Sequence, residues 1–333
     1  MPGIKELKTR IKSISGTRKV TRAMQMVSAA KMRKSQDATM RSRTYASLAW
    51  ELILDIEAGS TAAIATPGQD AVDVLQESAD LDPSSRMLLP GMTQLMTSYP
   101  KATKIAVLIL TTNRGMVGSL NSNLLNLVQK TIESEVRWAP SEPDNSKTDG
   151  AHRLEADFIT YGRKGRDVMI RSHKEVLADF EKFDRTITTE DIFPIAELIT
   201  NLYSSGKYQK VLIFYNRFVS TLVQKPMVKQ LLPFASNSAP TKDSELKTAD
   251  YLFEPNPAEV LKHLLPRIIE SQIYQTILES EASEQSARMV MMKNATEAAG
   301  DLISDLTLTY NKLRQNKITT ELAEITAGKI ALE

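Results

Sequence analysis

The chain has 333 residues, enough for one to three domains, and its 42% apolar content is enough for a buried core. It contains no cysteine, which excludes disulfides and thiolate metal sites, and its three histidines are too scattered to suggest a metal site. The net charge of +2 conceals an uneven distribution, because residues 1–43 carry twelve Lys and Arg and only two acidic residues. We therefore expect a basic N-terminal segment that pairs with an acidic partner.

The N-terminal segment, residues 1–58, is predicted to be one long helix. From Ile4 to Ala58 there is no proline and only one glycine, and 55 residues at 1.5 Å each would reach roughly 80 Å. Apolar residues follow the 3-4-3 spacing of a coiled-coil seam, the stripe that faces a partner helix. They are Ile4, Leu7, Ile11 and Ile14, and the pattern resumes at Val20, Met24 and Val27. A solvated amphipathic helix on a globular domain is the alternative.

Residues 59–100 are predicted to be a linker or insertion. Gly59 and the Pro67-Gly68 pair should end the first helix, and Pro83, Pro90 and Pro100 should interrupt any regular element in the rest of this stretch.

The middle of the chain, residues 101–235, changes to the pattern of an α/β domain. Strands are expected at 104–110, 156–161 and 210–215, with an extended stretch at 220–232. Helices are expected at 124–132, 163–173 and 191–204. Strands that alternate with helices favour a Rossmann-like layer in which part of the sheet is parallel.

A second linker, 236–257, precedes a C-terminal helix at 258–333. Asn256 can cap this helix and Pro257 suits its first position, whereas Pro266 should kink the helix or move its start. Downstream, a second coiled-coil seam repeats at 4-3-4-3 spacing. Its members are Ala299, Ile303, Leu306, Tyr310 and Leu313.

Candidate chemical sites in this sequence are weak. The loop 113–119 and the turn 162–165 join strands to helices, where α/β folds bind phosphate, but neither has a dinucleotide-binding or P-loop pattern. Glycines in such turns more often serve backbone geometry. The basic residues between Arg18 and Lys34 suit nucleic acid, yet that segment has no aromatic residues for stacking. No motif of a hydrolase, zinc protease or cysteine nucleophile occurs.

Both ends of the chain resemble the gamma subunit of F-type ATP synthase. The N-terminal match covers residues 4–33, including Thr17-Arg18-Lys19-Val20-Thr21-Arg22-Ala23-Met24. The C-terminal match includes Ser283-Glu284-Gln285-Ser286-Ala287-Arg288-Met289, Tyr310-Asn311-Lys312-Leu313-Arg314-Gln315 and Ile318-Thr319-Thr320-Glu321-Leu322. With shorter matches at 230–233 and 251–255, the resemblance spans most of the chain except about 60–100 and 137–152.

The resemblance implies a fold, a function and a set of partners. The two terminal helices would form an antiparallel coiled coil, the central shaft of a rotary machine, inside a ring of alpha and beta subunits. The α/β domain would lie below, against the epsilon subunit and the membrane rotor ring of c subunits. Proton flow through that ring would drive ATP synthesis, or be driven by hydrolysis, on the beta subunits. This subunit would have no catalytic residue, cofactor, metal or small-molecule substrate, would not bind nucleic acid, and would be held peripherally at the cytoplasmic face of a bacterial membrane.

The resemblance also implies specific contacts. Residues expected to contact beta and couple rotation to catalysis are Arg314, Gln315, Thr319, Glu321 and Met24. A basic face toward the alpha and beta subunits would consist of Lys19, Arg22, Lys31 and Arg33. The chain departs from the family in the loop after the first strand, where Asn113, Val117 and Ser119 replace the usual residues, and in a long 60–100 stretch without a cysteine pair.

Two other functions remain open from the residues alone. One is a free-standing α/β nucleotide-binding enzyme with helical arms, which would show turnover as an isolated chain. The other is a coiled-coil scaffold or nucleic-acid binder, whose binding to DNA or RNA would be sensitive to salt.

Overall fold

A computed structural model describes residues 3–65, 95, 99–100, 102–137, 154–183, 185, 187–234 and 257–330. Most of the two predicted linkers therefore lies outside the described residues. Two long helices, α1 (Ile4–Ala65) and α6 (Pro257–Ile330), enclose the central elements in the sequence. These elements are β1 (Lys104–Leu110), α3 (Leu120–Arg137), β2 (Glu155–Tyr161), α4 (Arg163–Arg171), β3 (Val176–Phe180), α5 (Phe193–Ser204), β4 (Tyr208–Phe218) and β5 (Gln224–Leu232).

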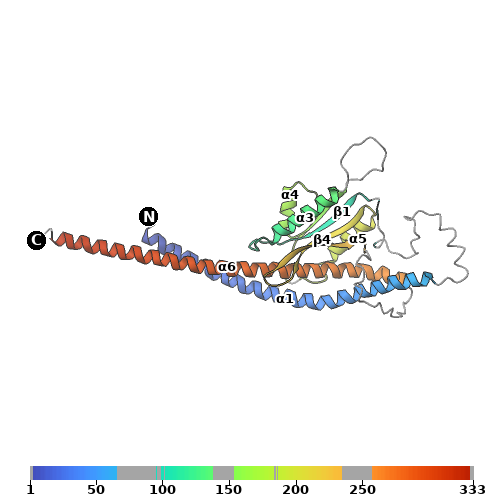
Figure 1. The fold of residues 1–333 in the computed structure, drawn as a ribbon, viewed down its shortest axis with the longest axis horizontal. Coiled ribbons are helices and arrows are strands. Elements are labelled where there is room, and N and C mark those ends of the chain that lie inside the picture. Colours follow the sequence, from blue (N-terminus) through green and yellow to red (C-terminus); the bar gives the residue numbers. More distant parts are fainter. Residues whose placement is uncertain are drawn as a thin grey trace, which may run out of the picture.

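The two long helices lie side by side and run in opposite directions (Figure 1). The hydroxyl oxygens of Thr21 and Thr296 are 2.8 Å apart, and the guanidinium of Arg18 lies against Gly300. Residues nearer the start of α1 therefore lie beside residues nearer the end of α6. The predicted antiparallel pair of terminal helices is confirmed.

The boundaries of the long helices differ in part from the prediction. The first helix was predicted to end at Ala58, but α1 continues to Ala65. A glycine inside a helix costs only about 1 kcal/mol, so Gly59 does not stop a helix that continues into alanines. The C-terminal helix begins at Pro257, as expected, and its start is not moved by Pro266.

Pro266 is accommodated inside α6 because its neighbours are buried. Leu265, Ile268 and Ile269 are at most 1% exposed in the core of the α/β domain. Burying three such side chains gains several kcal/mol, at about 1.5–3 kcal/mol each, which offsets the roughly 3 kcal/mol cost of an interior proline.

The central domain is a five-stranded sheet in the order β3-β2-β1-β4-β5. Strands β1 to β4 are parallel and β5 is antiparallel to β4; Val107 of β1 is level with Phe158 of β2 and Leu212 of β4. The predicted Rossmann-like domain, with part of its sheet parallel, is confirmed. Strand β1 is central and covered on both faces, which explains its unbroken apolar sequence.

Helices cover both faces of the sheet. On one face, Leu108 of β1 packs in a core with residues of α5 and with Ile269 and Ile273 of α6. On the other face, Val107 and Ile109 pack with residues of α3 and α4. The long helix α6 is therefore a core element of the α/β domain as well as the partner of α1.

Strand β3 was not predicted. It is a five-residue strand at the sheet edge, and its half-buried side chains alternate with exposed ones. A run of five residues is too short to give a clear sequence signal. Strand β4 is also longer than the predicted 210–215, because it pairs with β5 as far as Phe218.

The turn after β2 depends on glycine. Gly162 has φ 101° and ψ 143°, and a Cβ atom there would lie 2.5 Å from the carbonyl oxygen of Thr111. Gly165 donates its N–H to the hydroxyl of Thr111 at 2.8 Å. The glycines of the turn 162–165 thus allow α4 to approach the end of β1, which supports the backbone interpretation over a phosphate site.

We expect Gly162→Ala to destabilise the fold. The backbone conformation is one that side chains rarely adopt and costs about 1–3 kcal/mol, and the clash with Thr111 adds to it. The check is the free energy of unfolding of the purified chain. Gly115→Ala is the matched control, since nothing lies within 4 Å of a Cβ placed at Gly115 and it has no positive φ. Equal stability of the two variants would contradict the assigned role.

Candidate functional site

The face of α1 that meets α6 differs in part from the predicted seam. Near the N-terminus, Leu7 is buried and Ile4, Ile11 and Ile14 are half-buried, as predicted. Further along, Val20 and Val27 are more than half exposed, so their assignment to the seam is wrong. The buried stripe instead contains Ser28, Met32, Ser35 and Thr39.

Small polar residues explain this shift. Three small polar residues of α1 are buried from solvent: Ser28, Ser35 and Thr39. The hydroxyl of Thr39 donates a hydrogen bond to the backbone oxygen of Ser35 at 2.8 Å. A serine or threonine whose hydroxyl bonds to its own helix can be buried at little cost and lets two helices approach closely. A search for apolar spacing misses such positions. On α6, the predicted seam from Ala299 to Leu313 is half-buried at every position.

One end of α6 extends beyond its partner helix (Figure 1). The pairs Thr21–Thr296 and Arg18–Gly300 place the first residue of α1 level with about residue 314 of α6 by helical geometry. Every described position from 314 to 327 is exposed. Ile318, Leu322 and Ile325 are 48%, 60% and 70% exposed. Large apolar side chains in a row on a protruding helix indicate a surface that other polypeptides cover.

Four predicted coupling residues lie on this protruding end. Arg314 and Gln315 are exposed, the hydroxyl of Thr319 donates to the backbone oxygen of Gln315 at 3.0 Å, and Glu321 lies 3.5 Å from Lys317. None of these contacts removes the polar groups from solvent. These residues are therefore available to a partner along one helical segment.

Met24, the fifth predicted coupling residue, lies elsewhere. It is half-buried on α1, one turn beyond Thr21, and so is level with about residue 293 of α6. That is about 30 Å along the helix axis from Arg314. The structure does not bring Met24 together with the other four residues.

The four residues of the predicted basic face differ in exposure. Lys19, Arg22 and Arg33 are exposed, whereas Lys31 is half-buried. Glu281 of α6 lies within reach of the charge of Lys31. Three of the four basic residues thus face outward, and Lys31 is partly directed at the chain's own α6.

Glu281 is a buried carboxylate at the junction of the α/β domain with both long helices. Burial raises its pKa, Lys182 lowers it, Glu284 raises it, and Lys31 and Lys34 lower it, with a raised pKa as the result. One of its carboxylate oxygens, Oε2, is buried without a hydrogen-bond partner among the described residues. Folding therefore makes protonation of Glu281 easier than in the unfolded chain.

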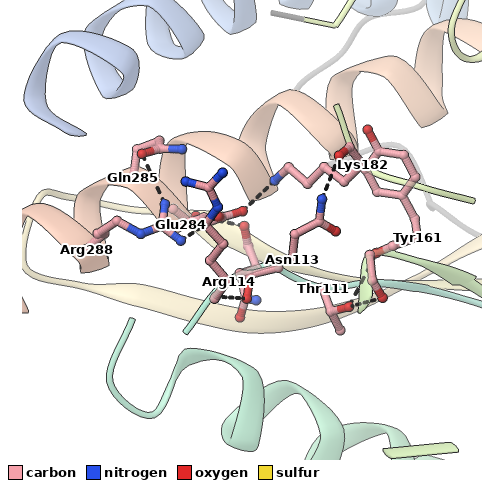
Figure 2. Close-up of polar contacts among 12 residues, drawn as sticks. Thr111, Asn113, Arg114, Tyr161, Lys182, Glu284, Gln285 and Arg288 are labelled. Atoms are coloured by element: carbon pink, nitrogen blue, oxygen red, sulfur yellow. Dashed lines mark hydrogen bonds and ion pairs between the residues drawn. The ribbon is translucent and has the colours of Figure 1, made fainter. Parts of the chain in front are cut away.

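A second buried carboxylate, Glu284, is fully paired. Its oxygens lie 2.5 Å from Nζ of Lys182 and 2.7 Å from a guanidinium nitrogen of Arg288, and all three side chains are less than a tenth exposed. Figure 2 shows Glu284 between these two cations, with Lys182 entering from the loop after β3. Burial would raise the pKa of Glu284, but the charges and hydrogen bonds of Lys182 and Arg288 outweigh it and hold the pKa below its ordinary value.

The loop 113–119 contacts the cluster of Lys182, Glu284 and Arg288. Asn113 donates from its amide to the backbone oxygen of Lys182 at 2.6 Å (Figure 2). Its side-chain oxygen accepts the N–H of Arg163 at 3.2 Å. At the other end of the loop, a Cβ placed at Gly118, whose φ is 61°, would lie 3.3 Å from the sulfur of Met291. The loop is therefore engaged by the chain's own residues where a phosphate would otherwise lie.

Sequence reasoning missed Lys182 and Glu284. They are 102 residues apart, and neither belongs to a spacing motif that predicts a contact. No helix in the described ranges is both long and apolar enough to cross a membrane. Within the same ranges, no group of three or more His, Asp or Glu residues is arranged to hold a metal ion.

Replacing Glu281 should stabilise the chain at neutral pH. A carboxyl whose pKa is raised on folding destabilises the folded state once the pH exceeds its ordinary value of 4.5, and the loss grows until the folded-state pKa is passed. Glu281→Gln should therefore raise the melting temperature at pH 7 and leave it unchanged well below pH 4.5. The exposed Glu297 supplies the control Glu297→Gln. A lower melting temperature of Glu281→Gln at pH 7 would refute the assignment.

Comparison with known proteins places the whole chain in one family. The family model described as ATP synthase matches residues 3–332. The ATP synthase gamma chain of Roseiflexus sp. is 36% identical over 332 residues, covering 100% of this chain and 99% of the relative. The ATP synthase gamma chain of Legionella pneumophila is 35% identical over 336 residues, covering all of both chains.

Solved structures show the same fold. The chain matches one from the Euglena gracilis mitochondrial ATP synthase OSCP/F1/c-ring structure with a TM-score of 0.60 and 18% identity, over 99% of this chain and 94% of that one. A chain of the Euglena rotor structure gives 0.55 and 17%, over 95% and 98%. Full-length identity of 35–36% to two gamma chains, with this fold, supports one conclusion: the chain belongs to the ATP synthase gamma-chain family.

Proposed function

We propose that this chain is the central rotor shaft of an F-type ATP synthase. It turns inside the ring of alpha and beta subunits and couples proton flow through the membrane rotor ring to ATP synthesis, or hydrolysis, on the beta subunits. The observation that carries this proposal is the protruding end of α6, where apolar and polar side chains from 314 to 327 are all exposed. A surface of this kind needs surrounding protein, and a ring supplies it.

The helix pair supports this role mechanically. Two helices wound together resist bending and twisting better than one, and α6 is anchored in the core of the α/β domain over residues 265–278. The shaft also has different side chains on each face, so identical catalytic subunits around it meet different surfaces. Each orientation then favours different open and closed states through differential contact free energy.

The energy available matches such a device. One charge that crosses a membrane potential of 100 mV releases about 2.3 kcal/mol, and several charges cross for each ATP. A shaft with only soft internal contacts would store part of this energy as elastic twist.

Partners follow from the two ends of the molecule. The protruding end of α6 and the paired helices lie inside the alpha and beta ring, and the α/β domain meets the epsilon subunit and the c subunits. The chain is held peripherally at the cytoplasmic face of a bacterial membrane through these partners. The exposed Lys19, Arg22 and Arg33 face acidic loops of beta in this arrangement, whereas Lys31 is partly directed at Glu281.

The chain itself is not the catalyst. In open α/β sheets, ligands bind outside the carboxyl ends of the strands, and here that edge is occupied by Glu284, Lys182 and Asn113 in contacts with one another. These contacts support the proposal that phosphoanhydride chemistry takes place on the beta subunits.

Purification distinguishes this function from its rivals. We expect the chain to co-purify with alpha and beta subunits in one copy per ring, and the isolated chain to show no ATP turnover. ATP hydrolysis by the isolated chain would favour an enzyme instead. Salt-sensitive binding of DNA or RNA by a chain that does not join the ring would favour a nucleic-acid binder.

Mutation of the protruding end tests the coupling residues. Arginine is enriched among the interface residues whose replacement by alanine costs more than about 1 kcal/mol of binding free energy. We therefore expect Arg314→Ala or Gln315→Ala to lower ATP-driven proton pumping several-fold and to weaken assembly, without changing the circular dichroism of the chain. Arg171→Ala, at the exposed end of α4 across the sheet from α6, is the control. Wild-type pumping in both variants would argue against these residues.

A further inference from the structure

Polar groups at one edge of the sheet converge on one short segment of α6, residues 283–288, either directly or through Lys182. After β1, Asn113 holds the backbone of Lys182 and accepts the N–H of Arg163, which follows β2. After β3, Lys182 itself reaches Glu284. The contacts from β4 and from the turn before β5 are the hydroxyl of Ser283 to the backbone oxygen of Asn216 at 2.8 Å, and the hydroxyl of Ser286 to the backbone oxygen of Thr221 at 2.8 Å.

The rest of the domain holds α6 by apolar packing. Leu265, Ile269, Ile273 and Ile277 are at most 1% exposed in the core shared with α5 and the sheet. This packing already opposes rotation of α6 about its own axis, because rotation would expose the buried side chains. Directional contacts away from the axis add to that resistance and define one angular setting.

The charged contacts of this segment are directional and hard to break. The side chains of Lys182 and Glu284 are 8% and 7% exposed. Removing one partner of a buried ion pair leaves an uncompensated buried charge, which is strongly destabilising. Any turn of α6 that moves Glu284 away from Lys182 incurs much of that cost. The depressed pKa of Glu284 keeps it ionised at neutral pH, so the contact is charged under working conditions.

We propose that Lys182, Glu284 and Arg288 form a buried charge lock that fixes the rotational setting of α6 relative to the α/β domain. Torque that enters through the α/β domain is passed to the shaft at this point. Lys182 and Asn113 are positioning residues: Lys182 supplies the charge from the domain, and Asn113 holds the loop that carries it. The lock rests on the proposed rotor function, because only a chain that transmits torque needs it.

The experiment measures torsional stiffness in the whole complex. A bead is fixed to the α/β domain, the alpha and beta ring is immobilised, and the angular fluctuation of the bead is recorded while catalysis is stalled. Lys182→Met should increase the variance of the angle several-fold and lower the number of protons pumped for each ATP hydrolysed. Lys182→Arg should restore both. Lys293→Met is the matched control, because it removes an exposed ion pair within α6 that does not reach the domain.

A second variant tests the lock even if the Lys182→Met chain does not assemble into the complex. Asn113→Ala removes the hydrogen bond that holds the loop of Lys182 but leaves every charge of the lock in place. It should give a smaller rise in the variance. If Lys182→Met does not assemble, Asn113→Ala decides the question.

The outcomes separate the lock from the rotor function. Wild-type variance and pumping in Lys182→Met or, failing that, in Asn113→Ala would overturn the lock while leaving the rotor intact. Failure of the wild-type chain to rotate within the ring would overturn the proposed function itself. Loss of thermal stability in Lys182→Met with unchanged variance would show that the cluster serves folding alone, which also overturns the lock.

Discussion

The middle of α6 belongs to two packed structures at once, and the rest of the molecule depends on this. Between Leu265 and Leu278 the helix fills one face of the sheet, where its apolar side chains are almost completely buried. The same helix then pairs with α1. One continuous helix belongs both to the core of the domain and to the coiled coil. The domain therefore cannot separate from the shaft without losing its own core. Pro266 is tolerated inside α6 because its neighbours are buried in that core.

The surroundings of α6 change along its length in a way that matches a shaft. Residues 265–288 are mostly buried by the α/β domain and α1, the seam from Ala299 to Leu313 is half-buried by α1, and residues 314–327 are exposed. Apolar residues continue into the exposed end, where Leu322 and Ile325 follow Ile318 at helical spacing. In the proposed rotor function, the surrounding subunits bury these side chains.

The α/β domain uses the part of its fold that usually holds a ligand for a different purpose. The carboxyl edge of a parallel sheet collects loop residues from several strands in one place. In this chain those loops meet a charged segment of α6, where Glu284 pairs with Lys182 and Asn113 binds the backbone oxygen of Lys182.

The sequence by itself determined the elements whose burial is apolar and periodic: the two long helices, the central strand β1, and the α6 seam from Ala299 to Leu313. Its terminal motifs also indicated the family. Only the tertiary structure decided the α1 stripe at Ser28, Ser35 and Thr39, the edge strand β3, and the pairing of Lys182 with Glu284. The physical reason is common to these cases. A periodic apolar pattern reports burial through local spacing, whereas buried polar residues and short edge strands are stabilised by partners distant in the chain, which spacing does not encode.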